Sequence, residues 1–412
     1  MTMEAFPALL DRARSLADQF ALSASHYDET GNFPFANFDA LFEADLLRLT
    51  ASADHGGFGA GLTEAQAIVA EIARGEPSTA LVLAMHYHHH HAIAHSGKWP
   101  KHLVERLNKA NLDHVSLVNS AQVEPRVGSP SHGTPPETIA RREGTRWKLS
   151  GHKTYATGVK RLEWISVLAV TDEPEPRLAS FLVRSDAPGL HIVETWNATG
   201  MRATASHDIL LQDVDVPLDD IIDPRPLSEG LRRDEYGMAW YFLLIASVYQ
   251  GIARAAGSWI LRFAASHAPA SLGAPLSTEP AIQDGIGEIE QRLAINERLL
   301  RSTAEDADVR RPLGLSSALV KHEVVENAVA VTSRALELGG NPGLKRDNPL
   351  ERHHRDALCG RAHAPQNGMI RTMAAKAAFA RLEKQAELPP LRDPAAPTTQ
   401  APPRPKLATV RG

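Results

Sequence analysis

The chain has a single cysteine, Cys359, among its 412 residues. An intramolecular disulfide is therefore impossible, and the fold must be held by the burial of apolar side chains. The N-terminal segment also lacks the basic end and the apolar core of a secretory signal. Both absences favour a cytoplasmic protein.

Blocks of basic residues and long apolar runs are also absent. The formal net charge is −5 and no cluster of Lys and Arg occurs, which argues against nucleic acid or an anionic membrane as a partner and favours a small molecule. The charge-free stretch 237–252 is shorter than the roughly 20 residues that cross a bilayer. We expect it to be a buried helix of a bundle.

The pattern of apolar residues predicts an α+β protein. Three- and four-residue steps predict an N-terminal α-helical domain over 1–115, in which Thr63 caps a helix. Short runs rich in β-branched and aromatic residues predict a middle β domain, a barrel or sandwich, over 116–225. Helical patterns return over 226–388 and predict a C-terminal bundle. The proline-rich segment 389–412 is expected to be a disordered tail.

Five short motifs follow one another along the chain. They are Asp54 to Gly59 (DHGGFG), Glu124 to Ser129 (EPRVGS), Gly151 to Gly158 (GHKTYATG), Gly200 to Thr204 (GMRAT) with Asp213 to Pro217 (DVDVP), and Gly339 to Asn341 (GGN) followed by Arg352, Arg355 and Asp356. In this order they resemble the signature segments of the acyl-CoA dehydrogenase superfamily. The resemblance implies an N-terminal helical domain, a middle β domain and a C-terminal four-helix bundle, assembled into a homo-oligomer, usually a tetramer.

The same resemblance implies a flavin cofactor, FAD or FMN. A flavin needs hydrogen-bond partners at the edge of its ring, a flat side chain against the ring and backbone N–H groups for its phosphates. Thr157 would bond near the reactive nitrogen of the ring, Tyr155 would pack on the ring, and Gly340 would let the cofactor of a neighbouring subunit approach closely. The residues that would line the ring and phosphate loop are Gln122, Val123, Gly128 and Ser129.

Three departures from the family pattern concern the cofactor. Val123 stands where a flavin-contacting Thr is usual, and Pro130 stands where Asp is usual. The Arg-x-x-Phe-Gly element that reaches the pyrophosphate of FAD across a dimer is not recognisable in residues 266–276. These departures weaken the expectation of FAD, which is the first candidate from the resemblance, and FMN stays open.

A further departure removes the residue on which the usual reaction depends. An acyl-CoA dehydrogenase takes a proton from the carbon next to a thioester with a carboxylate, while a hydride passes to the flavin. In the common pattern this Glu falls at Ala364, and in the alternative pattern it falls at Trp240 or Tyr241. None of these side chains is a base, so dehydrogenation would need another acid such as Glu235.

His363 stands next to the missing base, in a His-Ala-Pro turn. This arrangement resembles the flavin-dependent monooxygenases of the same fold, including the dibenzothiophene-oxidising type, which carry histidines near the flavin. In those enzymes a separate flavin reductase supplies reduced flavin, O2 adds to its C4a carbon, and the resulting hydroperoxide transfers one oxygen. His363 would hold and protonate the hydroperoxide, because the pKa of histidine lies near working pH.

The run His86 to His91 contains a second candidate. His86 and His90 are one helical turn apart and could bind a divalent ion, but no third ligand follows at a suitable spacing, so no metal site is predicted. The segment aligns with a family helix that carries a single His near the active site. His86 is therefore the second catalytic candidate, with ordinary core or surface histidines as the alternative.

Three hypotheses follow from these residues. The leading one is a two-component flavin-dependent monooxygenase that acts on a small molecule with O2. The alternatives are an acyl-CoA dehydrogenase with an atypical base and a flavin-free binding protein of the same fold. They differ in whether the protein takes up flavin and in whether an acyl-CoA bleaches it.

Overall fold

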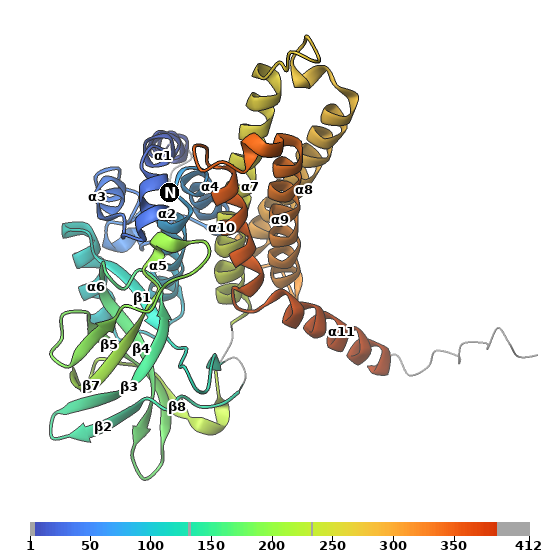
Figure 1. Ribbon diagram of the computed structural model, residues 1–412. Helices are drawn as coiled ribbons and strands as arrows, with labels where there is room; N and C mark the ends of the chain where they lie inside the picture. The colour runs from blue at the N-terminus through green and yellow to red at the C-terminus, as the bar shows by residue number, and fades with distance from the viewer. Residues whose placement is uncertain (1–4, 131–132, 232–233, 385–412) are drawn as a thin grey trace, which may run out of the picture. The chain divides into compact units, whose positions relative to one another are not determined.

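The computed structural model describes residues 5–130, 133–231 and 234–384 (Figure 1). The helices before the sheet are α1 (Ala5–Ala21), α2 (Ala24–Thr30), α3 (Phe35–Glu43), α4 (Leu62–Gly75), α5 (Pro77–His95) and α6 (Lys101–Asp113). The strands are β1 (Leu117–Ala121), β2 (Ile139–Glu143), β3 (Arg146–Ala156), β4 (Leu162–Asp172), β5 (Arg177–Arg184), β6 (Leu190–Val193), β7 (His207–Pro217) and β8 (Ile221–Pro226). The helices after the sheet are α7 (Glu235–Ser266), α8 (Pro280–Asp308), α9 (Ser316–Gly343), α10 (Leu350–Ala362) and α11 (Asn367–Lys384).

The chain divides into two compact units, 1–370 and 371–412. The first unit holds all elements up to the start of α11. The second unit continues α11, on which Phe379 and Leu382 are exposed. The predicted disordered tail, 389–412, lies outside the described residues.

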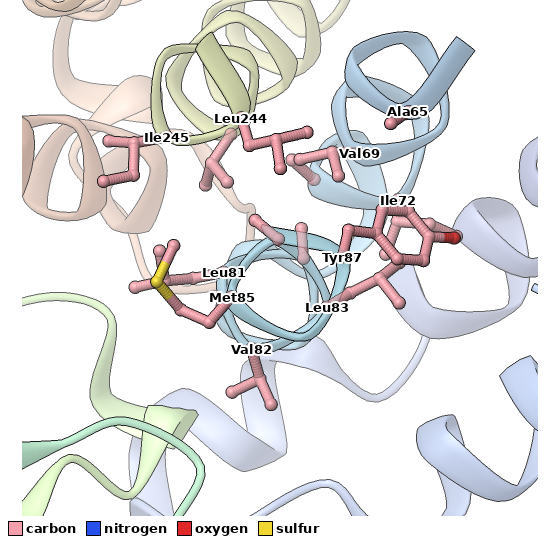
Figure 2. Close-up of a cluster of buried hydrophobic side chains, with 14 of the residues drawn as sticks. Ala65, Val69, Ile72, Leu81, Val82, Leu83, Met85, Tyr87, Leu244 and Ile245 are labelled. Atoms are coloured by element: carbon pink, nitrogen blue, oxygen red, sulfur yellow. The ribbon is translucent and has the colours of Figure 1, made fainter. Parts of the chain in front are cut away.

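Helix α5 lies at the centre of the largest hydrophobic core. Figure 2 shows Val69 of α4 and Leu244 of α7 pointing toward α5. The helix starts with Pro77 in its first turn, and the carboxylate of Glu76 accepts hydrogen bonds from backbone N–H groups of that turn. Pro at this position and an acceptor before it are favourable helix starts. The residues that follow are buried on nearly every side, so α5 can present its histidines to several neighbours.

The start of α4 differs from the predicted cap at Thr63. The helix begins at Leu62, and the carboxylate of Asp308 on α8 accepts hydrogen bonds from the backbone N–H groups of Leu62 (2.7 Å) and Thr63 (2.9 Å). The Thr63 hydroxyl donates to the same carboxylate at 2.6 Å. The capping group therefore comes from a distant helix and not from Thr63.

The eight strands form one hydrogen-bonded sheet in the order β6-β7-β3-β2-β4-β5-β8, with β1 paired to β4. The pairs β1 with β4 and β2 with β4 are parallel, and the other pairs are antiparallel. The central strand β4 reads as a nearly continuous buried run because both of its faces are covered. The predicted middle β domain is confirmed.

Helices α7, α8, α9 and α10 pack against one another as a bundle (Figure 1). A polar layer crosses its core, where the side-chain amide of Asn296 on α8 donates to Gln250 of α7 (3.0 Å) and Asn327 of α9 donates to Asn296 (2.8 Å). The charge-free stretch 237–252 lies within α7, as predicted. In the described ranges no helix is long and apolar enough to cross a membrane. The predicted order of helices, sheet and bundle is confirmed.

Candidate functional site

Tyr155 lies near the end of β3 in a strained backbone conformation. The pairing of β3 with β7 shifts register between Lys153 and Ala156, and Tyr155 has a φ of 57° there. Residues other than glycine rarely adopt this left-handed conformation, which is typical of ligand-contacting positions. The ring is 62% exposed and meets Trp196 edge to face, with 6.4 Å between the ring centroids. Tyr155 therefore presents an exposed aromatic surface at the end of β3.

Thr157 lies just beyond Tyr155 at the same end of β3. Its N–H donates to the Tyr155 carbonyl at 2.9 Å, and its carbonyl accepts from the Asn119 side-chain amide at 2.9 Å. Its hydroxyl oxygen lies 3.0 Å from the hydroxyl of Ser206 on the other side of the β3–β7 pair. The structure brings Tyr155 and Thr157 together, and their roles toward a flavin stay predictions.

The loop 122–129 lies beside this end of β3. Backbone hydrogen bonds in both directions between Glu124 and Gly128 close it, at 3.1 and 2.9 Å, and Gly128 has a φ of 73°, which favours glycine. The N–H of Thr154 on β3 donates to the Val123 carbonyl at 2.9 Å. The four residues predicted to line the cofactor are in this loop: Gln122, Val123, Gly128 and Ser129.

A buried ion pair joins the loop to β3. The ammonium of Lys153 lies 2.6 Å from the Glu124 carboxylate, and the two side chains are 0% and 2% exposed. The same carboxylate accepts from the N–H groups of Glu137 (2.6 Å) and Thr138 (3.0 Å) and from the Thr138 hydroxyl (2.6 Å). Burial lowers the pKa of Lys153 to about 8, although the hydrogen bond to Glu124 opposes that shift. The sequence motifs contained both residues, but only their burial reveals the pair.

This end of the sheet fits a flavin. Tyr155 supplies a flat side chain, and the Thr157 hydroxyl supplies a hydrogen-bond partner for a ring edge. At Gly128 an added Cβ would meet no atom within 4 Å, so the loop leaves open space at that point.

A buried lysine holds the His-Ala-Pro turn after α10. Lys321 of α9 is fully buried, and its ammonium donates to the carbonyls of Gly360 (3.2 Å), His363 (3.0 Å) and Pro365 (3.1 Å) and to Oδ1 of Asn367 (3.0 Å). It satisfies carbonyls that the end of a helix leaves without an intrahelical partner. Burial lowers its pKa to about 8. The sequence analysis did not single out Lys321.

The ring of His363 is held by a tyrosine of α7. The Tyr249 hydroxyl lies 3.1 Å from Nδ1 of His363. Burial and then the Lys321 ammonium lower the pKa of His363 to about 4, while burial raises the pKa of Tyr249 well above its usual value. Both groups are therefore neutral at neutral pH. The expectation that the pKa of His363 lies near working pH is wrong, because the ring is buried beside a cation.

Glu235 does not take the place of the missing base. Its carboxylate accepts hydrogen bonds from the N–H groups of Leu313 and Gly314. It thereby holds the loop between α8 and α9. The predicted alternative of an unaligned acid at this position has no support from the geometry.

His86 is a core histidine in this structure. It is fully buried, its Nε2 lies 2.9 Å from the Leu47 carbonyl, and its Nδ1 accepts from the Val118 N–H at 3.4 Å. Burial lowers its pKa to about 4. Because backbone groups use both ring nitrogens, the flavin-side role of His86 stays a prediction that this geometry does not favour.

Another face of α5 turns its histidines toward α7. His88 meets Tyr241 edge to face, with 5.6 Å between ring centroids, and its buried Nδ1 has no hydrogen-bond partner in the described part of the chain. His91 stacks on Trp240 at 3.9 Å between ring centroids and also meets His95. The sequence analysis missed His88. The available signal was the spacing of His88, His91 and His95, which places them on one helical face.

A cavity of about 430 Å³ adjoins this face of α5. Its wall includes His91, His95, Tyr236, Trp240, Asp308 and Arg310. Asp308 is already engaged by the start of α4, and the Arg310 guanidinium lies 5.2 Å from the centre of the Tyr236 ring. The wall therefore combines aromatic and imidazole rings with small residues and with the charged side chains of Glu64, Asp308 and Arg310.

The Arg-Asp motif of α10 has a packing role. The Asp356 carboxylate accepts from the Met201 N–H at 2.6 Å, and Arg355 pairs with both carboxylate oxygens of Asp28 at 3.0 and 2.6 Å. A Cβ added at Gly200 would lie 2.5 Å from the Arg355 carbonyl oxygen. Burial raises the pKa of Asp356 to about 7. The motif thus joins the bundle to the segment before β7 and to α2.

Gly340 interrupts α9. Its φ of 54° and ψ of −146° are not helical, and this region of φ and ψ is open to glycine alone. It is exposed, and an added Cβ would meet no atom within 4 Å. Its contact with the cofactor of a neighbouring subunit stays a prediction.

Within the described ranges no group of three or more His, Cys, Asp or Glu side chains is placed to hold a metal ion. The histidines of α5 are divided between the core and the α7 side of the helix, so they do not converge.

The helix, sheet and bundle order, with an aromatic and a hydroxyl side chain at the end of β3, defines a flavin-dependent oxidoreductase. The chain matches the N-terminal, middle and C-terminal domains of acyl-CoA dehydrogenases over residues 4–99, 120–214 and 243–367. The chain belongs to the acyl-CoA dehydrogenase family.

Relatives within this family differ in their names. The chain is 32% identical to the putative acyl-CoA dehydrogenase YdbM of Bacillus subtilis, over 89% of this chain and 96% of that protein. It is 25% identical to KijD3 in complex with FMN and an amino-keto deoxysugar nucleotide, with a TM-score of 0.80 and coverage of 92% and 95%. TdsC from Paenibacillus in complex with FMN and indole shares the fold, at 23% identity and a TM-score of 0.78, with coverage of 88% and 95%.

Proposed function

We propose that the protein is a flavin-dependent monooxygenase, which oxidises a small molecule with O2 and receives reduced flavin from a separate reductase. The observation that carries this proposal is the turn after α10. Where the common dehydrogenase pattern has its carboxylate, the chain has Ala364, beside a neutral imidazole held by Tyr249. A turn that offers a hydrogen bond and no base suits oxygen transfer better than proton abstraction.

Tyr155, Thr157 and the loop 122–129 would hold the flavin. When bound, the flavin supplies the electrons that activate O2. The segment 267–279 after α7 contains no Arg or Lys for the second phosphate of FAD. We therefore place FMN first, which agrees with the FMN complexes of KijD3 and TdsC. Titration with FMN and with FAD, followed by flavin fluorescence, compares the two dissociation constants.

His363 would act as a neutral hydrogen-bond donor to the reacting oxygen. The Tyr249 hydroxyl lies 3.1 Å from Nδ1 of His363, and we propose the tautomer in which this hydroxyl donates to Nδ1. The ring proton then lies on Nε2, which remains to donate to a bound group. Lys321 holds the main chain of the turn, so the direction of this donor is set before a ligand arrives.

A homo-oligomer belongs to the same proposal. Its support is the exposed backbone break at Gly340, whose geometry lets another subunit approach closely. Light scattering of the purified protein measures the assembly.

The test is an oxygen-transfer assay with FMN, NADH, a flavin reductase and a panel of aromatic heterocycles. Oxygen-18 from O2 is expected in the product. His363→Ala is expected to lower product formation at least tenfold while NADH consumption continues, because the reductase step does not need this protein. Full product formation by His363→Ala, or no labelled product from any member of the panel, would count against the proposal.

An acyl-CoA dehydrogenase with an atypical base is the second candidate, because YdbM carries that putative name at 32% identity over almost its whole length. Anaerobic addition of butyryl-CoA and longer thioesters to the flavin-loaded protein distinguishes the two. Bleaching of the oxidised flavin without reductase would favour the dehydrogenase.

A further inference from the structure

A row of hydroxyl groups runs inward from Thr157. The Thr157 and Ser206 hydroxyl oxygens are 3.0 Å apart, and the Ser206 and Thr204 hydroxyl oxygens are 2.9 Å apart. The row ends where the Thr204 hydroxyl donates to the Met201 carbonyl at 2.9 Å. Thr204 and Ser206 are 0% and 5% exposed. Solvent therefore does not compete for the inner members of the row.

The protons in this row can be assigned by counting. Three hydroxyl groups carry three protons, and the row contains three close oxygen–oxygen contacts. A contact of 2.9 to 3.0 Å between buried oxygens requires a proton between them, because two facing lone pairs repel. The Met201 carbonyl also accepts from the Trp196 Nε1–H at 3.0 Å and from the Thr204 N–H at 3.2 Å, but it cannot donate, so its 2.9 Å contact with the Thr204 hydroxyl places the Thr204 proton toward it. The Ser206 proton then lies toward Thr204, and the Thr157 proton lies toward Ser206.

We infer that Thr157 can only accept a hydrogen bond from a bound ligand, and that the site therefore selects reduced over oxidised flavin. N5 of a reduced flavin carries a hydrogen and can donate to Thr157. N5 of an oxidised flavin carries a lone pair, which would face the lone pairs of the Thr157 hydroxyl. This inference rests on the proposed function, in which Thr157 lies at the reactive edge of the ring, and it adds which redox form the site is built to receive.

Ser206 sets the preference for reduced over oxidised flavin, and it can do so without contacting the flavin. Removing the Ser206 hydroxyl takes away the acceptor of the Thr157 proton. The proton can then turn toward the ligand and donate to N5 of the oxidised form. Ser206 is thus a positioning residue, whose effect is on the ratio of two affinities.

The experiment measures dissociation constants for oxidised and for dithionite-reduced FMN under anaerobic conditions, by fluorescence and equilibrium dialysis. The natural protein is expected to bind reduced FMN at least about tenfold more tightly, which corresponds to a shift of the two-electron potential of bound FMN by about +30 mV. Ser206→Ala is expected to tighten oxidised FMN by about tenfold. Thr157→Val is expected to weaken reduced FMN, and to tighten oxidised FMN less than Ser206→Ala does, because Val removes the facing lone pairs but cannot donate to N5.

Ser247→Ala is the matched control, because Ser247 is a buried serine of α7 whose hydroxyl donates to the Leu243 carbonyl. It is expected to leave the ratio of the two constants unchanged. If Thr157→Val weakens reduced FMN while Ser206→Ala changes neither constant, the proton assignment is wrong and the proposed function stands. If the natural protein binds no flavin in either redox form, both the inference and the proposed function fail.

Discussion

The hydrogen bond between Tyr249 and His363 decides which ring nitrogen carries the proton. Tyr249→Phe removes the donor to Nδ1 at the cost of about 1 kcal/mol of stability. The ring can then place its proton on either nitrogen and loses its orientation. We expect product formation to fall by about tenfold or more while the fold is kept, as measured by turnover and by thermal melting.

Tyr87→Phe is the matched control for this change. Tyr87 of α5 is also a fully buried tyrosine, and its hydroxyl donates to the Leu46 carbonyl at 2.7 Å. Its ring points from α5 into the hydrophobic core and makes no hydrogen bond to His363. Figure 2 shows its ring on the side of α5 that faces Ile72 of α4. An equal loss of turnover in both variants would mean that Tyr249 acts only through stability.

The turn after α10 depends on one ammonium group supplied by α9. Lys321→Met keeps the apolar length of the side chain but leaves three carbonyls and Asn367 without their donor. Leaving buried acceptors unpaired costs about 1 to 3 kcal/mol each, so we expect a loss of at least about 3 kcal/mol in the free energy of unfolding. Urea denaturation measures it, with Lys148→Met as control, since Lys148 pairs with Asp215 on the surface of the sheet.

The pH dependence of the free energy of unfolding distinguishes a buried Lys321 ammonium from a side chain that acts only by packing. Burial lowers the pKa of Lys321 in the folded state to about 8, so between about pH 8 and 10.4 the unfolded chain holds a proton that the folded chain has released. Stability from this group therefore rises as pH rises through that window. The rise is expected to be smaller in Lys321→Met, in which Lys153, whose pKa burial also lowers to about 8, still contributes over the same window. The same slope in both would contradict the assignment.

The elements were more predictable than the contacts between them. Helical and strand periodicity predicted the order of α1, the sheet and α7, because apolar spacing reports directly on burial. The group that starts α4 comes from Asp308, and the group that holds loop 122–129 is the Lys153 ammonium. Local sequence carries no signal for either pairing, since each depends on segments brought together only by the fold.

Only part of the site could be predicted, because some of its contacts join segments that are far apart in the sequence. The motif around Tyr155 and Thr157 placed two candidates at one end of a strand, where the structure has them. The family resemblance points to one histidine of this helix, His86, whereas the helical face shared by His88, His91 and His95 points to His88. The neutral state of His363 depends first on burial and then on the Lys321 ammonium, and both arise only when the chain folds, so no local pattern could have given the pKa.

Across the whole molecule, burial keeps several histidines neutral. His86 and His353 are 0% and 3% exposed, and burial lowers their pKa values to about 4 and about 3. An unfolded histidine has a pKa near 6.5. Between about pH 6.5 and 4 the unfolded chain therefore binds protons that the folded chain does not. Unfolding takes up these protons, so stability is full above about pH 6.5 and is lost as pH falls.

We expect the buried histidines to destabilise the protein above the pH range in which ordinary carboxylates titrate, opposed by Asp356, whose pKa burial raises to about 7. At pH 5 each of His86 and His353 costs about 2 kcal/mol relative to pH 7, a large share of the stability of a typical protein. Urea denaturation at pH 7, 6 and 5 measures the fall. His353→Gln removes one titrating group and is expected to reduce the difference between pH 7 and pH 5 by about 2 kcal/mol, whereas His191→Gln, at an exposed position, is expected to leave it unchanged. Identical differences in all three proteins would show that buried imidazoles do not set the acid limit.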